Sequence, residues 1–143
     1  MRNDKRTGTF PKALLTAALF VIQLTWGFPQ TLLGFFVFLK NIKEPHSLHR
    51  FSVYTRWRDD LSGVSLGLFT FTGSDCMDDM KNHELGHCVQ SLILGPLYLF
   101  VIGLPSLIWN RRWTKNLKRG GLQKNYFTFF TEKWAESIKK RLT

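Results

Sequence analysis

Two histidines that are four residues apart, with a glutamate directly after the first, are the residues of this chain best suited to chemistry. They are His83, Glu84 and His87, in the run His83-Glu-Leu-Gly-His87. On a helix, residues four apart lie on one face, one turn apart. Both imidazoles can then reach one zinc ion at about 2.0–2.1 Å, and Glu84 can hold a zinc-activated water and take its proton. The motif predicts a zinc site with Glu84 as the general base.

A catalytic zinc usually has three protein ligands and one open position, so a third ligand must come from elsewhere in the chain. His46 and His49 are candidates, but they lie in a polar, basic stretch where a solvated loop is the simpler interpretation. Glu132 is the better candidate, because it lies in Thr131-Glu-Lys-Trp-Ala-Glu136 on a predicted C-terminal helix.

This arrangement resembles the gluzincin metallopeptidases, notably the membrane-bound HtpX and CAAX-prenyl-endopeptidase type. In that family HExxH is followed downstream by a helical Glu-x-x-Ala-Asp, whose Glu is the third ligand and whose Asp orients a histidine. The resemblance implies that Glu132 is the third ligand, with Ala135 matching as well. Glu136 stands where the family has Asp and is one methylene longer. This resemblance covers only the two helices.

A second resemblance spans most of the chain. The sequence is similar to small bacterial membrane proteins of no established activity, which combine Trp-x-x-Pro-Gln with HExGH, Leu-Gly-Pro-Leu-Tyr-Leu and Thr-Glu-Lys-Trp-Ala. The matching segments here are 26–30, 83–87, 94–99 and 131–135.

The elements that must position these residues can be predicted from pattern. A helix is expected over 77–94, capped by Ser74 or Asp75 and ended by Gly95-Pro96. Asp79 lies one turn before His83, where it either bonds the free ring nitrogen of that histidine or only suits the positive end of the helix dipole. A final amphipathic helix is expected over 125–142.

Period-two patterning between residues 50 and 73 predicts two strands, which we expect to form an antiparallel β-hairpin. In zincins an edge strand beside the active-site helix pairs with the substrate backbone. The resemblance makes the strand from Val64 to Phe71 the candidate, with Leu66, Leu68 and Thr70 along it; an ordinary core strand is the alternative. Tyr126 is either an oxyanion donor or, more simply, a packed aromatic residue.

Two apolar runs indicate a membrane. Residues 10–39 carry one charge, Lys12, and exceed the roughly 20 residues that a span needs. We expect a retained anchor that Pro29 kinks into a bent span or a helical hairpin. Residues 96–109 are uncharged but short, as in a re-entrant or membrane segment. For Glu132 to meet the histidines, this second run must return to the side of the membrane from which it entered.

The net charge of +10 fits an anionic membrane surface or nucleic acid. No nucleic-acid motif is present, so we favour the membrane. Lys and Arg flank both apolar runs, which favours a catalytic face on the cytoplasmic side. Two cysteines, Cys76 and Cys88, do not make a disulfide framework and are expected to be free thiols.

Together these observations predict a single α+β domain over 1–143, with a minimal zincin-like core and an N-terminal membrane helix or helical hairpin. The predicted function is that of a zinc-dependent metallopeptidase of the bacterial cytoplasmic (inner) membrane, acting on a peptide or membrane-protein substrate. One alternative is a non-catalytic membrane-bound binding or immunity-type protein with a structural or vestigial zinc site. Another is a basic nucleic-acid-associated factor.

Overall fold

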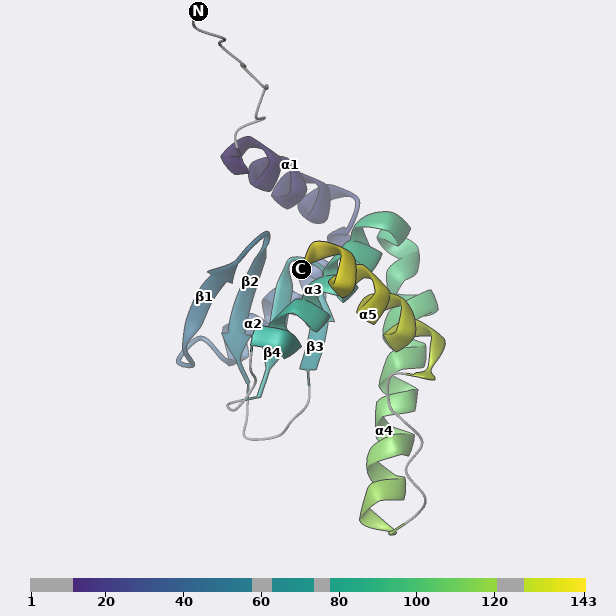
Figure 1. The fold of residues 1–143 in the computed structure, drawn as a ribbon. Helices are drawn as coiled ribbons and strands as arrows, with labels where there is room; N and C mark the ends of the chain where they lie inside the picture. Colours follow the sequence, from purple (N-terminus) through teal and green to yellow (C-terminus); the bar gives the residue numbers. More distant parts are fainter. Residues whose placement is uncertain (1–11, 58–62, 74–77, 121–127) are drawn as a thin grey trace, which may run out of the picture.

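The computed structural model describes residues 12–57, 63–73, 78–120 and 128–143, except for the side chains of residues 78 and 79. Within these ranges the chain is α+β, as predicted, with five α-helices and a four-stranded mixed sheet (Figure 1). The elements are α1 (Lys12–Thr25), α2 (Phe28–Lys40), β1 (His46–His49), β2 (Ser52–Arg56), β3 (Gly63–Leu66), β4 (Phe69–Thr72), α3 (Asp78–Leu94), a 3₁₀ turn η1 (Gly95–Leu97), a π turn η2 (Leu99–Gly103), α4 (Leu104–Lys118) and α5 (Phe130–Leu142).

The sheet differs from the predicted hairpin. Its strand order is β1-β2-β4-β3, and β2 pairs with β4 in parallel. The prediction of one antiparallel hairpin over 50–73 was therefore wrong: β3 and β4 form a tight hairpin of their own, and β1, which was not predicted, pairs with β2. The turn between β3 and β4 relies on Gly67, whose φ of 61° lies in the left-handed region.

The two faces of the sheet carry different side chains. Phe69 and Phe71 point to one face and, with Leu68, form the apolar core, where the ring of Phe38 from α2 lies 5.3 Å from that of Phe69. The alternate residue Thr70 points to the other face, where its hydroxyl contacts Cys88 of α3. Helices α2 and α3 therefore cover opposite faces of the sheet, and α3 rests on small polar residues.

Helix α5 packs across α3 at a point where both helices have small residues. A Cβ atom on Gly86 would overlap the backbone carbonyl of Ala135, so only glycine permits this approach. Figure 1 shows α5 crossing beside α3, and its C-terminal end reaches the β1–β2 turn, where Arg50 donates to the carbonyl of Leu142. The pair Gly86–Ala135 thus sets the separation at which side chains of the two helices meet.

The first apolar run forms two helices rather than one. The helix is interrupted by a turn at Trp26-Gly27. Pro29 lies in the first turn of α2, where its missing N–H costs no helical hydrogen bond. The axes of α1 and α2 are bent by 95°. The predicted kink is therefore a sharp corner, and it begins just before the proline.

The second apolar run also bends. The helical stretch that ends at Leu97 and the stretch Leu99–Lys118, which begins with the π turn η2 and continues as α4, are bent by 119°. Among the described residues no single helix is both long and apolar enough to cross a bilayer; the two bent pairs meet the length and hydropathy requirement only as pairs. Beyond the bend, the first turn of α4 lies beside α5, where Ser106 contacts Glu132.

Candidate metal centre

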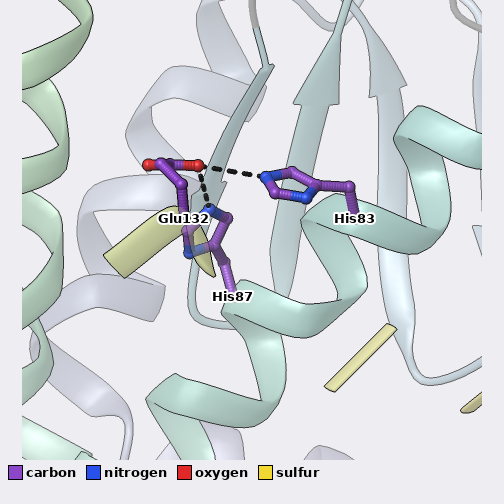
Figure 2. Close-up of side chains that lie close together, drawn as sticks. All are labelled: His83, His87 and Glu132. Atoms are coloured by element: carbon purple, nitrogen blue, oxygen red, sulfur yellow. Dashed lines mark hydrogen bonds and ion pairs between the residues drawn. The ribbon is translucent and has the colours of Figure 1, made fainter. Parts of the chain in front are cut away.

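Figure 2 shows His83 and His87 projecting from α3 towards the carboxylate of Glu132, which enters from α5. All three side chains are buried. The Oε2 atom of Glu132 lies 3.1 Å from Nε2 of His83 and 3.2 Å from Nε2 of His87. Glu132 lies 49 residues after His83 and 45 after His87, so side chains from distant parts of the sequence converge on one point.

The donor set fits a metal ion. One ligand atom from each residue lies within 4.8 Å of the others, and no other such group occurs among the described residues. Tetrahedral ligands at about 2.0–2.1 Å from zinc are about 3.3 Å apart, close to the two measured separations. Two imidazole nitrogens and one carboxylate oxygen are also the donors of a His₂Glu site.

A chain of charged groups fixes the orientation of His83. Its Nδ1 atom donates to Oε2 of Glu136 at 2.9 Å, and Lys139 holds the other oxygen of Glu136 at 2.8 Å. Glu136 thus reaches His83 despite its additional methylene relative to Asp. The contact leaves Nε2 directed at the site; carboxylates that do not touch the metal commonly orient metal-binding histidines in this way.

A neutral amide fixes His87. Its Nδ1 atom donates to Oε1 of Gln90 at 2.7 Å, and Nε2 of Gln90 donates to the carbonyl of Thr131 at 3.0 Å. Sequence reasoning missed Gln90 and Lys139. Gln90 lies three residues after His87 and hence on the same helix face, a spacing that would have identified it.

The ring nitrogens of both histidines have oxygen atoms beside them. Without a metal ion, a proton on each Nε2 would serve the contacts to Glu132 that a metal would otherwise bridge. Burial alone lowers the pKa of His87, but the hydrogen bond to Glu132 and the charge of Glu84 raise it to about 9. Burial raises the pKa of Glu132, but the hydrogen bonds from both histidines outweigh it and the net shift is downward. Without a metal ion, protonated imidazoles would pair with Glu132, and a metal ion would displace those protons.

Glu84 is buried against β3. Its Oε2 atom has no hydrogen-bond partner among the described residues, and a Cβ on Gly63 would overlap its other oxygen, Oε1. Burial raises the pKa of Glu84, although the charges of His87 and His83 lower it. A buried carboxylate oxygen without a partner, on the turn of α3 that carries both histidines, is unusual in a folded protein.

The other predicted site residues are placed differently. Thr70 lies on β4, an interior strand paired on both sides, and Leu68 is buried in the β3–β4 turn, so neither lies on an open edge. Only Leu66 lies on the edge strand, β3. His46 bonds Thr55 and the carbonyl of Ile42, and His49 bonds Asn82; neither joins the triad.

Several predictions fall outside the described residues. They concern the side chain of Asp79, the caps Ser74 and Asp75, and Tyr126 and Cys76. Cys88 is described: it is a buried free thiol beside Ser65 and Thr70, and burial raises its pKa to about 11. A thiol with so high a pKa is an unreactive packing group at neutral pH.

Comparisons with models of known families, with curated proteins and with solved structures found no match to this chain. The assignment therefore depends on the site itself. The buried group of His83, His87 and Glu132, on a helix that packs against the C-terminal helix, is consistent with a zincin-like metal site.

Proposed function

We propose that the chain is a membrane-associated, zinc-dependent metallopeptidase that hydrolyses a peptide bond. The observation that carries the proposal is the combination of the buried triad with the unpartnered Oε2 of Glu84 beside it. A purely structural metal site requires ligands and no additional buried carboxylate, whose desolvation is costly without a partner.

Each residue then has a role. His83, His87 and Glu132 would hold zinc, with Glu136 and Gln90 fixing the imidazoles. When bound, zinc supplies Lewis acidity and lowers the pKa of a water in its open position. Oε2 of Glu84 would accept a proton from the attacking water and return it to the leaving amine. The raised pKa of Glu84 suits a base that must also act as an acid.

The substrate would lie along β3. This strand is an edge of the sheet, and Gly63 at its start touches Glu84, so a peptide backbone paired there would pass the proposed base. Tyr98 already donates to the carbonyl of Ser65 at 2.9 Å. Among the described residues, the part of the edge without such a contact is its Gly63 end, nearest to Glu84.

The exposed apolar side chains support membrane association. They gather on α1, on α2 and between residues 97 and 108, the segments that form the two bent pairs; examples are Leu14, Val21, Phe36, Phe100 and Ile108. Basic residues follow these segments, including Lys40, Lys43, Arg111 and Arg112. This pattern suits a surface that lies in a bilayer with its flanks at anionic headgroups. Resistance to extraction by high salt, with release by detergent, is the expected result; release by salt alone would contradict it.

The catalytic proposal is tested by Glu84→Gln, which keeps the size of the side chain and removes its basicity. Purified in detergent, the variant should keep one zinc per chain and lose hydrolysis of a quenched fluorescent casein by about 10²–10⁴-fold. Glu44→Gln, at an exposed glutamate outside the triad and its hydrogen-bond partners, is the matched control and should retain activity. Equal hydrolysis by the wild type and Glu84→Gln would overturn the proposal.

A further inference from the structure

The hydroxyl of Ser106 donates a hydrogen bond to Oε1 of Glu132 and so links α4 to the candidate metal centre. The two oxygens of Glu132 thereby have separate partners. Oε2 faces both imidazoles, whereas Oε1 accepts from Ser106 and, at 3.4 Å, from Thr131. A carboxylate whose second oxygen is held cannot rotate freely, so it presents the first oxygen in one direction.

Ser106 is an isolated polar residue in an apolar segment. Between residues 97 and 108 only Tyr98 and Ser106 carry a side-chain hydroxyl. Tyr98 binds the carbonyl of Ser65, which leaves Ser106 as the hydroxyl of this segment that reaches Glu132. A serine is neutral, so it directs the carboxylate without removing the negative charge that a metal ligand needs.

The π turn before α4 accounts for the direction of Ser106. A π turn holds about one residue more than an α turn, which rotates everything after it by about 100°. The turn η2 ends at Gly103, and Ser106 lies in the first turn of α4. The neighbours Leu104, Leu107 and Ile108 are exposed. One face of this helical turn thus meets the triad while the rest forms part of the apolar surface.

We propose that Ser106 is a positioning residue for the metal centre, holding Glu132 so that Oε2 ligates the ion. The proposal rests on the metal site of the proposed function but not on catalysis. Partners of metal ligands typically contribute about 10–100-fold to metal affinity, which sets the expected size of the effect.

The test compares zinc affinity in wild type, Ser106→Ala and Ser106→Thr, in the same detergent, by competition with a chromophoric chelator. Ser106→Ala should weaken zinc binding about 10–100-fold, and Ser106→Thr, which keeps the hydroxyl, should remain within about threefold of wild type. Ser137→Ala, at an exposed serine on α5, is the matched control and should not change affinity. The visible spectrum of bound Co²⁺ should change in Ser106→Ala only, because the ligand geometry changes while the fold does not.

Zinc affinity within twofold of wild type in Ser106→Ala, with the same cobalt spectrum, would overturn the proposal. If Ser106→Ala does not fold, Ser106→Val replaces it, since valine has the shape of threonine without the hydroxyl. Equal zinc affinity in Ser106→Val and Ser106→Thr would then contradict the role of the hydroxyl. Neither result depends on hydrolysis, so an inactive but zinc-binding chain would refute the peptidase and leave this proposal standing.

Discussion

Two neighbouring stripes of α3 are both polar and buried, yet they differ in charge. His83, His87 and Gln90 face α5 and end in an ion-paired cluster with Glu132 and Glu136. On the adjacent stripe, Cys88 and Ser91 face the sheet and α1, where their partners are neutral. The difference separates a cluster that can exchange protons for a metal ion from a network that can only hold the fold.

The neutral network occurs where α1 and α2 meet. Gln23 donates to the carbonyls of Gly67 and Cys88 and accepts from Ser91, and Gln30 donates to Ser91 and to the carbonyl of Gly95. Two of these bonds satisfy carbonyls at turns, those of Gly67 and Gly95, and one ties α1 to a carbonyl within α3. The segment Trp26-Gly-Phe-Pro-Gln30 is therefore part of a structural joint.

The largest predicted difference between the two stripes is in their response to pH. His87 has a pKa of about 9 in the metal-free protein and about 6.5 when unfolded, so its pairing stabilises the fold fully below pH 6.5 and is lost as pH rises through 9. The pKa values of Glu132 and Glu136 are lowered, so their contribution is present above pH 4.5 and is lost as pH falls through the folded values.

Zinc must displace protons from this cluster. Its affinity should therefore rise about tenfold per pH unit for each proton displaced between pH 6 and pH 8. Chelator competition at several pH values measures the slope, and calorimetry in buffers of different ionisation enthalpy counts the protons. A zinc affinity that does not change with pH would show that the metal binds elsewhere.

The next largest effect is expected where α3 and α5 touch. Gly86→Ala places a methyl group against the carbonyl of Ala135, so the helices must separate and carry Glu132 away from the histidines. Overpacking of this kind costs about 1–3 kcal/mol, and zinc affinity should fall about 10–100-fold. Gly103→Ala, whose new methyl would have its nearest neighbour at 3.6 Å, is the control and should bind zinc as wild type does. Equal affinities in the two variants would exclude a role for the close approach.

The smallest effect on zinc affinity is expected from a substitution in the neutral network. Gln23→Ala removes the donor to the buried carbonyls of Gly67 and Cys88 and the acceptor of the Ser91 hydroxyl, which should cost about 1–3 kcal/mol of unfolding free energy, with no pH dependence of its own. Zinc affinity of the folded variant should stay within twofold of wild type. Thr25→Ala, at an exposed position of the same helix, should change stability by less than about 0.5 kcal/mol. Urea unfolding measures the stability of both variants. Weaker zinc binding by folded Gln23→Ala would show that the neutral network also supports the metal centre.

Features that depend on contacts within one helix could be predicted from the sequence, whereas features that depend on contacts between distant segments could not. His83 and His87 belong to one helix, so local spacing placed them on one face, and the helix predicted over 77–94 matches α3. Glu132 depended on a resemblance, because no local pattern links α5 to α3. The prediction of the sheet was wrong for the same reason. Alternation indicates strands but does not reveal that β2 pairs with β4 in parallel rather than with β3.

The central claim is that His83, His87 and Glu132 hold one metal ion. Equilibrium dialysis against zinc, with metal measured by mass spectrometry, tests it most directly in wild type, His83→Ala, His87→Ala, Glu132→Ala and the control His49→Ala. Wild type and His49→Ala should bind one zinc per chain, and each triad variant should lose tight binding. Stoichiometric zinc that survives in Glu132→Ala at wild-type affinity, or a wild type that binds none, would contradict the account.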